Sequence, residues 1–494
     1  MPRRRLERTI TYPRDAATEE RVRLVADRVR GENGLTGSVR RWEPFALRAR
    51  HVDRPVPVLA LDDYSEIPFV DRVVGAPWYQ YRARLRCGDG DHYAVARAPI
   101  PGYEDYNRRL LGLGRARALH LDPSGTGLAL ARALREDRSA FGRLARLARD
   151  AGGLLVHPYM AIQPVWELAE GLSRAAGVPV RVLGPFPETT RLANDKARFG
   201  EIVERLFGRE SLACTATSGD PQVVAERLLE LAGRCDAVAL KRPSCASGLG
   251  NRVFDAREVR GRPLSDVRDL VDRFLVDKEW DGREPLLVVQ WHRDVIESPS
   301  TQCWIPPADA GDPWVDAVYE QFLVGEERVF EGAMLSALPV AIRDEFMRKS
   351  WLVCRVLQQL GYVGRCSFDG LVVGPNLEEA RVKFVECNGR WGGTSTPMHL
   401  MNRVLGDFRR TPYKAQDYVD ERLRGLGFVE LLEIFGDTLY DRRSGKGRVL
   451  LYNVGGVAEH GKFDIVVMGR TYGEIGRFIA REIPRRIDRY VGSR

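Results

Sequence analysis

Long apolar runs are missing from this sequence of 494 residues. The longest uncharged stretch, residues 151–166, is interrupted by Pro158 and Pro164, so the sequence predicts no transmembrane helix. The first residues also lack the apolar segment of a secretory signal, and acidic residues follow too early for a transit peptide. We therefore expect a cytoplasmic protein without a membrane partner.

Cysteine and lysine are both scarce. The eight cysteines include no C-x-x-C pair, so the sequence indicates neither a zinc site nor a disulfide framework, and reduced thiols fit it best. Only eight of the 76 basic residues are lysine. Because arginine is the usual cation of this chain, each lysine more readily reflects a need for a compact charge. Two of these lysines, Lys196 and Lys241, occur in the motifs described below.

Strong charge of one sign is absent as well. The net charge of +8 is small for this length, and the arginines are interleaved with acidic residues. We therefore expect no nucleic-acid partner, and we keep an arginine-rich nucleic-acid binder only as an alternative. With 44% hydrophobic and 29% charged residues, the composition is that of a globular protein with two to four domains.

The first part of the chain has the pattern of an α/β domain. From Val56 onward, short apolar runs alternate with helical segments, which is typical of a parallel sheet. A segment rich in proline and glycine, residues 179–187, indicates the end of this region.

The central motif is E-C-N-G-R at residues 386–390, which ends a predicted strand at 380–388. Residues two apart on a strand share a face, so Glu386 and Asn388 should point the same way. The preceding strand contains Asp369 as its only acid, and a carboxylate there is costly unless it is paired. These three oxygen-bearing side chains form a candidate Mg²⁺ site. The alternative is an ordinary exposed strand end.

Two lysines lie upstream of this motif. Lys196 opens a predicted helix for which Asn194 or Asp195 is the N-cap, and it could equally be a solvated surface residue. Lys241 ends a strand and is followed by a glycine-containing loop at 242–251. Such a loop can place backbone N–H groups over phosphates while the ammonium neutralises them. It is neither a P-loop nor a dinucleotide fingerprint, and a plain hairpin turn is the alternative.

A buried-looking strand at 285–292 ends in polar residues. Its end, at Gln290, Trp291 and His292, can offer backbone groups to an adenine, and Glu297 can accept hydrogen bonds from a ribose. The alternative is a strand end followed by a surface loop.

In this order the motifs resemble the ATP-grasp superfamily over about residues 190 to 400. The resemblance implies an α/β fold made of four parts. These are an α/β pre-ATP-grasp domain (1–190), the small lid subdomain of the ATP-grasp fold with its phosphate loop (191–278), the large α+β subdomain with the Mg²⁺ site (279–405) and a C-terminal α+β extension (406–494). The continuation G-G-T at 392–394 and the strands near 461–464 are similar to the pheganomycin-type peptide ligases.

The resemblance also implies residue roles. It assigns Lys196, Lys241, Ser247, Gly248 and Gly250 to the ATP phosphates, Gln290, Trp291 and His292 to adenine, Glu297 to the ribose, and Asp369, Glu386 and Asn388 to Mg²⁺ or Mn²⁺. Arg390 and Lys241 would be the catalytic groups that stabilise the transferred phosphoryl group. The family commonly has an acid where Gln290 stands, which leaves purine preference open, and its loop usually has more glycine.

For this superfamily the implied reaction joins a carboxylate to an amine. The carboxylate attacks the γ-phosphate to give an acyl phosphate, and the amine then forms the amide with release of ADP and phosphate. We expect a ligase that acts on small-molecule or peptide substrates, whose identities the sequence does not give. The alternatives are a non-catalytic nucleotide-binding regulator and an ATP-grasp kinase. Whether the chain forms a homodimer is left open.

Overall fold

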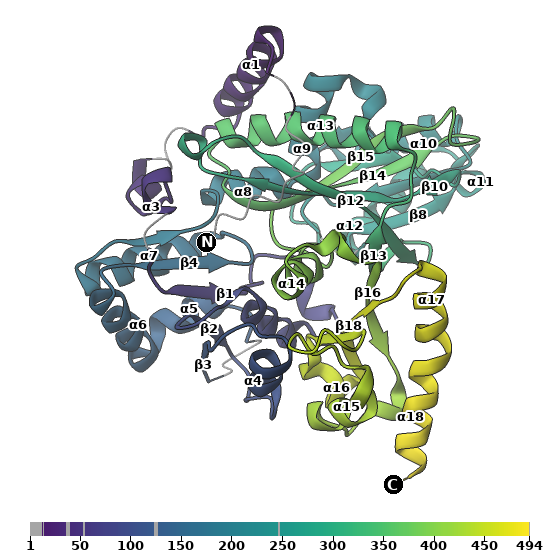
Figure 1. Ribbon diagram of the computed structural model, residues 1–494. Coiled ribbons are helices and arrows are strands. Elements are labelled where there is room, and N and C mark those ends of the chain that lie inside the picture. Colours follow the sequence, from purple (N-terminus) through teal and green to yellow (C-terminus); the bar gives the residue numbers. More distant parts are fainter. Residues whose placement is uncertain are drawn as a thin grey trace.

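The computed structural model describes residue 12 and residues 14–35, 40–52, 55–122, 127–245 and 248–493 (Figure 1). Ser247, which we assigned to the phosphate loop, lies outside these residues. The described strands form three sheets, one in the N-terminal region and two in the rest of the chain. No helix among the described residues is long and apolar enough to cross a membrane.

The N-terminal region is a parallel α/β domain, as its pattern predicts. Its five strands lie in the order β3 (Arg117–His120), β2 (His92–Val95), β1 (Val58–Leu61), β4 (Leu154–Pro158) and β5 (Val180–Val182). Parallel neighbours need long crossover connections, and helices such as α5 (Leu130–Glu136), α6 (Arg138–Asp150) and α7 (Gln163–Ala176) provide them. Trp166 of α7 is fully buried in the core of this domain.

The second sheet is antiparallel and lies mostly in the region predicted as the lid subdomain, so we call it the lid sheet, or the lid. Its strands lie in the order β6 (Cys214–Ser218), β9 (Leu286–Gln290), β7 (Ala237–Lys241) and β8 (Asn251–Asp255). Helices α10 (Pro221–Ala232) and α12 (Leu264–Asp277) share an apolar core with one face of this sheet. Because side chains alternate along a strand, a second and smaller apolar cluster lies on the other face. Strand β9 completes the sheet although it follows the predicted boundary at residue 278.

The third sheet has nine strands and carries the E-C-N-G-R motif. It comprises β10 (Val295–Glu297), β11 (Pro299–Ile305), β12 (Trp314–Val324), β13 (Val329–Leu335), β14 (Gly364–Val373), β15 (Arg381–Asn388), β16 (Tyr413–Val419), β17 (Val449–Tyr452) and β18 (Lys462–Met468). Helix α13 (Val340–Gln359) packs across one face (Figure 1). Strands β16 to β18 extend this sheet beyond β13, so the C-terminal region continues the sheet past residue 405.

A β-bulge interrupts β15 directly before the motif. Asp369 of β14 lies opposite Glu386, whereas the next residue, Gly370, lies opposite Phe384. Val385 is therefore an extra residue without a partner in β14, which is the definition of a bulge. Its position decides which face the following residues occupy.

The bulge moves Glu386 and Asn388 out of the core. Val382 and Phe384 face the core under α13, and unbroken alternation would put Glu386 and Asn388 on that same face. With one residue inserted, Cys387 is instead the residue that faces the core. Glu386 and Asn388 share a face, as predicted, and it is the face away from α13.

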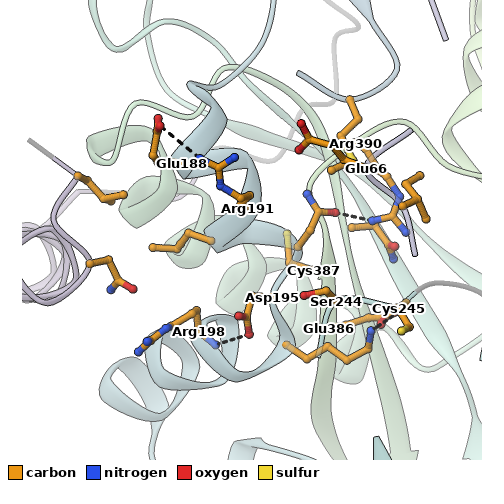
Figure 2. Close-up of a pocket in the computed structure, with 18 residues that line it drawn as sticks. Glu66, Glu188, Arg191, Asp195, Arg198, Ser244, Cys245, Glu386, Cys387 and Arg390 are labelled. Atoms are coloured by element: carbon orange, nitrogen blue, oxygen red, sulfur yellow. Dashed lines mark hydrogen bonds and ion pairs between the residues drawn. The ribbon is translucent and has the colours of Figure 1, made fainter. Parts of the chain in front are cut away.

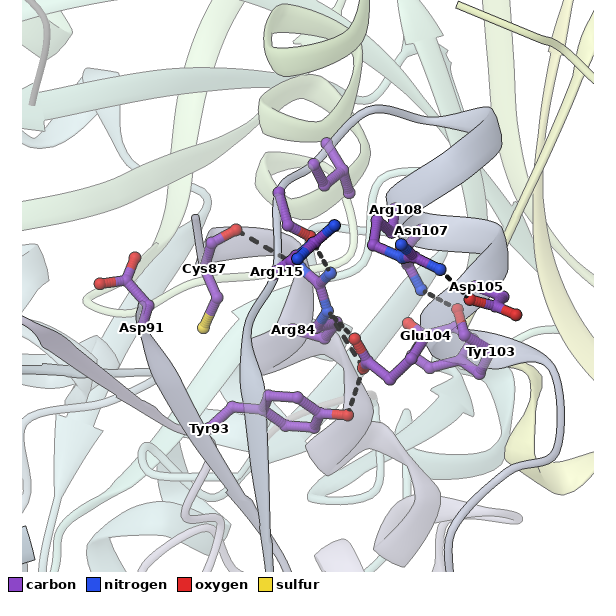
Figure 3. Close-up of polar contacts among 12 residues, drawn as sticks. Arg84, Cys87, Asp91, Tyr93, Tyr103, Glu104, Asp105, Asn107, Arg108 and Arg115 are labelled. Atoms are coloured by element: carbon purple, nitrogen blue, oxygen red, sulfur yellow. Dashed lines mark hydrogen bonds and ion pairs between the residues drawn. The ribbon is translucent and has the colours of Figure 1, made fainter. Parts of the chain in front are cut away.

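Arginine side chains form contacts within the N-terminal domain and between this domain and the C-terminal half of the chain. The side chain of Arg84 is fully buried, and its Nε lies 2.8 Å and 3.1 Å from the two carboxylate oxygens of Glu104, which also accepts a bond from Tyr93 (Figure 3). Arg403 of α14 (Ser395–Leu405) donates to the backbone oxygens of Leu85 and Cys87 at 2.7 Å and 2.6 Å. These contacts hold the helix after the motif against the N-terminal domain.

Candidate active site

A cavity of about 540 Å³ lies where the N-terminal domain, the lid and the large sheet meet. Helices α8 (Pro187–Asn194) and α9 (Lys196–Phe207) form one wall, and Glu66 and Met160 enter from the N-terminal domain. Ser244 and Cys245 of the loop after β7 also line it, together with the end of β15 (Figure 2). The volume is typical of a site for small ligands.

Lys196 links three of the predicted elements. Its Nζ lies 2.7 Å from Oε2 of Glu386 and donates to the backbone oxygens of Pro243 (3.2 Å) and Cys245 (2.7 Å). It stands in the first turn of α9, where Asp195 is the N-cap and accepts from two backbone N–H groups. Burial raises the pKa of Glu386, but the combined effect of Lys196, Arg390 and Lys241 is larger and the pKa is lowered overall. The lysine thus connects the phosphate loop to the motif.

Asp369 is half-buried and accepts two hydrogen bonds in the predicted metal site. Its two carboxylate oxygens accept from Oγ of Ser300 at 2.7 Å and from Nδ2 of Asn388 at 2.9 Å. Burial and the neighbouring Glu386 raise the pKa of Asp369 to about 7. Ser300 was not predicted, because it stands on β11 and only the register of β11 against β14 places it opposite Asp369.

This donor set fits a hard divalent cation. In the described part of the chain no three His, Cys, Asp or Glu side chains converge as a metal site, so an ion here would take two carboxylates and one amide from the protein. Mg²⁺ uses few protein ligands and completes its shell with phosphate and water oxygens. Two carboxylates held opposite each other repel, as the raised pKa of Asp369 shows, and a divalent cation would offset that repulsion.

Arg390 is held by Asn194. Its Nη1 donates to Oδ1 of Asn194, which also accepts from the backbone N–H of Gly389 at 3.1 Å. Nδ2 of Asn194 donates back to the Gly389 oxygen at 3.3 Å and to that of Thr190 at 2.8 Å. The end of α8 therefore orients the arginine. The sequence indicated Asn194 and Asp195 as the two candidates for the N-cap of α9. The N-cap is Asp195, and the contact of Asn194 with Arg390 was not predicted.

The predicted phosphate loop connects the antiparallel strands β7 and β8. The backbone N–H of Arg242 donates to the oxygen of Gly250 at 3.0 Å, which closes the turn. A Cβ on Gly250 would lie 2.6 Å from Cβ of Cys245, and Gly248 has a φ of +73°. Both positions thus need glycine. At its entrance, Nζ of Lys241 lies 5.0 Å from the centre of the Trp291 ring.

The predicted adenine hinge follows β9. The backbone N–H of Trp291 donates to the oxygen of Ala237 at 3.0 Å, and the oxygen of His292 accepts from Arg328. The guanidinium of Arg328 also lies 4.6 Å from the centre of the Trp291 ring. Burial lowers the pKa of His292. Two backbone groups of the hinge are therefore already engaged within the protein.

Small apolar clusters lie on both sheets near the hinge. Ala237, Ala239, Leu287, Val289 and Trp291 form one on the lid face that α10 and α12 do not cover. Ala213, Leu371 and Val373 form the other on the large sheet, on the same face as Asp369. These faces offer apolar surface to a flat ring.

The structure does not bring Glu297 to the other predicted residues. Glu297 lies opposite Val372, which faces the core under α13, and its carboxylate accepts from Oγ of Ser336 at 2.5 Å. Burial raises its pKa to about 7. Because Asp369 lies on the other face of this sheet, the ribose role is not supported for Glu297. The spacing from Gln290 could not reveal this, since it does not define the face.

Comparisons with known proteins agree with this architecture. Residues 81–173 match the family model of the pre-ATP-grasp domain. The chain is similar to an N5-carboxyaminoimidazole ribonucleotide synthetase in complex with ADP (TM-score 0.53, 9% identity, 89% of this chain and 99% of that one). It is also similar to the N5-carboxyaminoimidazole synthetase from Staphylococcus aureus complexed with ADP (TM-score 0.52, 8% identity, 88% of this chain and 100% of that one). A third similar structure is a β-γ-ATP complex of the Campylobacter jejuni biotin carboxylase (TM-score 0.51, 12% identity, 85% of this chain and 89% of that one).

At these identities the likeness establishes the fold. The chain has an α/β pre-ATP-grasp domain followed by an ATP-grasp fold, as the motifs predict. The comparisons do not single out the pheganomycin-type peptide ligases. Comparison with curated protein sequences gave no match.

Proposed function

We propose that this protein is an ATP-dependent carboxylate–amine ligase that forms an amide or peptide bond through an acyl phosphate. The observation that carries the proposal is the convergence, at or beside one cavity, of Lys196, Asp369, Glu386, Asn388 and Arg390. Phosphoryl transfer depends on positioning and on charge neutralisation more than on covalent help from the protein. This cluster supplies both, and it needs no protein nucleophile.

ATP would lie between the lid and the large sheet. Adenine would pack between the two apolar clusters, near Gln290, Trp291 and His292, and the phosphates would lie under the loop that contains Gly248 and Gly250. The similar solved structures that are complexes with ADP or ATP support a nucleotide in this fold. Lys241 lies at the end of β7 beside the Trp291 ring and would neutralise the phosphates.

Asp369, Glu386 and Asn388 would hold Mg²⁺, which when bound neutralises phosphate oxygens, and Mn²⁺ is the alternative ion. Lys196 would exchange part of its contact with Glu386 for a phosphate oxygen, because its Nζ already lies between the loop and the motif.

Arg390 would stabilise the transferred phosphoryl group, and Asn194 holds it in place for this task. The substrate carboxylate forms a bond to the γ-phosphorus as the bond to ADP breaks. The amine nitrogen then bonds to the carbonyl carbon, and phosphate leaves.

The test is ADP release from ATP and Mg²⁺ with pooled carboxylic acids, amino acids and short peptides. The wild type is compared with Glu386→Gln and with a matched control, Glu378→Gln, which changes an exposed acid between β14 and β15. We expect turnover that depends on the acid, is lost in Glu386→Gln and is retained in Glu378→Gln. A chain that binds neither ATP nor ADP would contradict the proposal.

The same assay separates the related alternatives. An amide product whose yield depends on the amine identifies a ligase. A phosphorylated product that forms equally without an amine would instead favour an ATP-grasp kinase. Nucleotide binding without turnover in any pool would favour the non-catalytic regulator.

A further inference from the structure

We propose that the cavity beside Arg390 binds the amine substrate as a zwitterion, with the ammonium at Glu66 and a free carboxylate at Arg191. The inference rests on the proposed ligase function. It names the class of amine substrate, a free α-amino acid or a short peptide whose own carboxylate does not react.

Glu66 is the exposed carboxylate of this cavity, and its protein contact is a hydrogen bond from the backbone N–H of Gln163 at the start of α7. Among the other lining acids, Glu188 lies 3.3 Å from Arg191, Glu386 lies 2.7 Å from Lys196, and Asp195 caps α9. Among the described residues no lysine or arginine lies within ion-pair distance of Glu66, although it lines the same cavity and is exposed. An ammonium group is the natural complement of such a carboxylate.

Helix α8 places a cation at a defined distance from the reaction centre. Asn194 holds Arg390, and Arg191 and Glu188 precede it at intervals of three residues, so the three lie along one side of the helix. Three residues correspond to a rise of about 4.5 Å along the axis. Arg191 thus lies about one turn from the residue that orients Arg390.

Arg191 is available to a substrate. Its partner is Glu188, at a separation of three residues on the helix surface, and the arginine side chain is 52% exposed. Exposed pairs of this kind are weak, so the guanidinium can exchange Glu188 for a carboxylate, which it can bind through two parallel hydrogen bonds.

Glu66 and Arg191 are close without forming an ion pair. Partial burial of the carboxyl group raises the pKa of Glu66, and Arg191 is the first of the charges that oppose this effect. Figure 2 shows Arg191 between Glu188 and Glu66. Glu66 and Arg191 line one cavity and do not form an ion pair with each other. They therefore complement a ligand that has both an ammonium and a carboxylate group.

The position of Arg390 decides which substrate this is. The carboxylate that becomes the acyl phosphate has to reach the γ-phosphate and so lies at Arg390. A carboxylate at Arg191 is therefore a different one. It belongs to the amine substrate, whose nitrogen is held on the side of Glu66.

The test measures amide formation with ATP, Mg²⁺ and pooled carboxylic acids against two amine pools, the free α-amino acids and the corresponding amino acid amides. Glu66→Gln, Arg191→Gln and Arg191→Lys are compared with two matched surface controls, Glu136→Gln and Arg174→Gln. A separate assay traps the acyl phosphate with hydroxylamine and reports only the first half of the reaction.

We expect the wild type to favour free amino acids at least tenfold. Arg191→Gln should raise the KM for free amino acids about tenfold and leave that for the amides unchanged, and Arg191→Lys should restore part of the loss. Glu66→Gln should raise the KM for both pools. Hydroxamate formation should be unchanged in all variants, which shows that they fold and use ATP.

Equal use of the two pools by the wild type would overturn this inference, and so would equal effects of Arg191→Gln on both pools. In either case hydroxamate formation would leave the ligase proposal standing. A wild type that forms no hydroxamate from any acid would overturn the ligase proposal, and this inference with it.

Discussion

Phe384 and Cys387 are three residues apart in β15, yet both face the core under α13. The bulge at Val385 is the reason, and it keeps Glu386 on the cavity side of the sheet. The faces of the motif residues therefore depend on Val385 being accommodated as a bulge rather than in regular alternation.

This arrangement predicts unequal effects for two deletions. Removing Val385 restores regular alternation and leaves Phe384, Glu386 and Cys387 on their present faces, so the variant should fold with a melting temperature within a few degrees of the wild type. Removing Lys383 turns Val382 away from the core and Arg381 toward it, and it should abolish cooperative unfolding. Thermal denaturation followed by circular dichroism checks both, and equal damage would argue against the bulge as the cause.

Gly389→Ala should disturb Arg390. A Cβ at this position would lie 2.8 Å from Nδ2 of Asn194 and 2.9 Å from Cβ of Ala193, so α8 has to move. We expect a loss of about 1–3 kcal/mol in the free energy of unfolding and a marked loss of ADP release. Gly219→Ala is the control, because nothing lies within 4 Å of its new Cβ. A normal rate in Gly389→Ala would show that Asn194 does not need this close contact.

Lys196→Met should weaken nucleotide binding. The variant loses the charge that pairs with Glu386 and meets two backbone oxygens of the loop. A hydrogen bond to a charged group contributes about 1.5–3 kcal/mol, so the Kd for ADP should rise about 10- to 100-fold. Calorimetry with ADP and Mg²⁺ measures it, and Lys446→Met, at an exposed position, is the control. An unchanged Kd would remove Lys196 from the site.

Glu297→Gln should change the dependence of stability on pH. The pKa of Glu297 in the folded protein, about 7, is above its usual value, so the folded state binds the proton more tightly. Stability from this group is complete below about pH 4.5 and is lost as the pH rises through 7. Glutamine keeps the acceptor for Ser336 and cannot ionise, so the variant should gain stability over the wild type between pH 5 and pH 8.

The expected difference is on the order of 1–2 kcal/mol, because Glu297 is only partly buried. Melting temperatures at pH 5, 6, 7 and 8 measure it. The Kd for ADP should not change, since Glu297 lies on the face covered by α13. A large loss of ADP binding would restore the ribose role that the resemblance implies.

The local sequence pattern was sufficient to predict the parallel sheet of the N-terminal domain and the two strands that hold Asp369 and Glu386. The alternation of short apolar runs with helices predicts the parallel N-terminal sheet, and Asp369 and Glu386 were assigned to neighbouring strands from their positions alone. The shared face of Glu386 and Asn388 was also predicted, although unbroken alternation would have placed both in the core. This prediction is correct only because β15 has a bulge at Val385, which the sequence of the strand does not predict.

The register between strands and the contacts between distant segments could not be predicted from the sequence. Ser300 lies beside Asp369 only because of how β11 pairs with β14, and Asn194 reaches Arg390 from a helix almost two hundred positions earlier. Glu66 comes from the N-terminal domain, for which no motif gave residues. Spacing along the chain predicts which residues share a face only within one regular strand. Gln290 and Glu297 belong to different strands, so their spacing could not show on which face of the large sheet Glu297 lies.

The continuation of the large sheet past β13 has a consequence for the molecule as a whole. Strand β16 pairs with β13 from Gly332 to Met334, and the C-terminal strands share one core with Tyr81 and Tyr93 of the N-terminal domain. A chain cut at residue 405 would keep every residue of the proposed catalytic cluster, but it would expose an unpaired strand edge and half of a hydrophobic core. We therefore expect that the C-terminal region is required for folding, and that the smallest part of this protein that folds includes it.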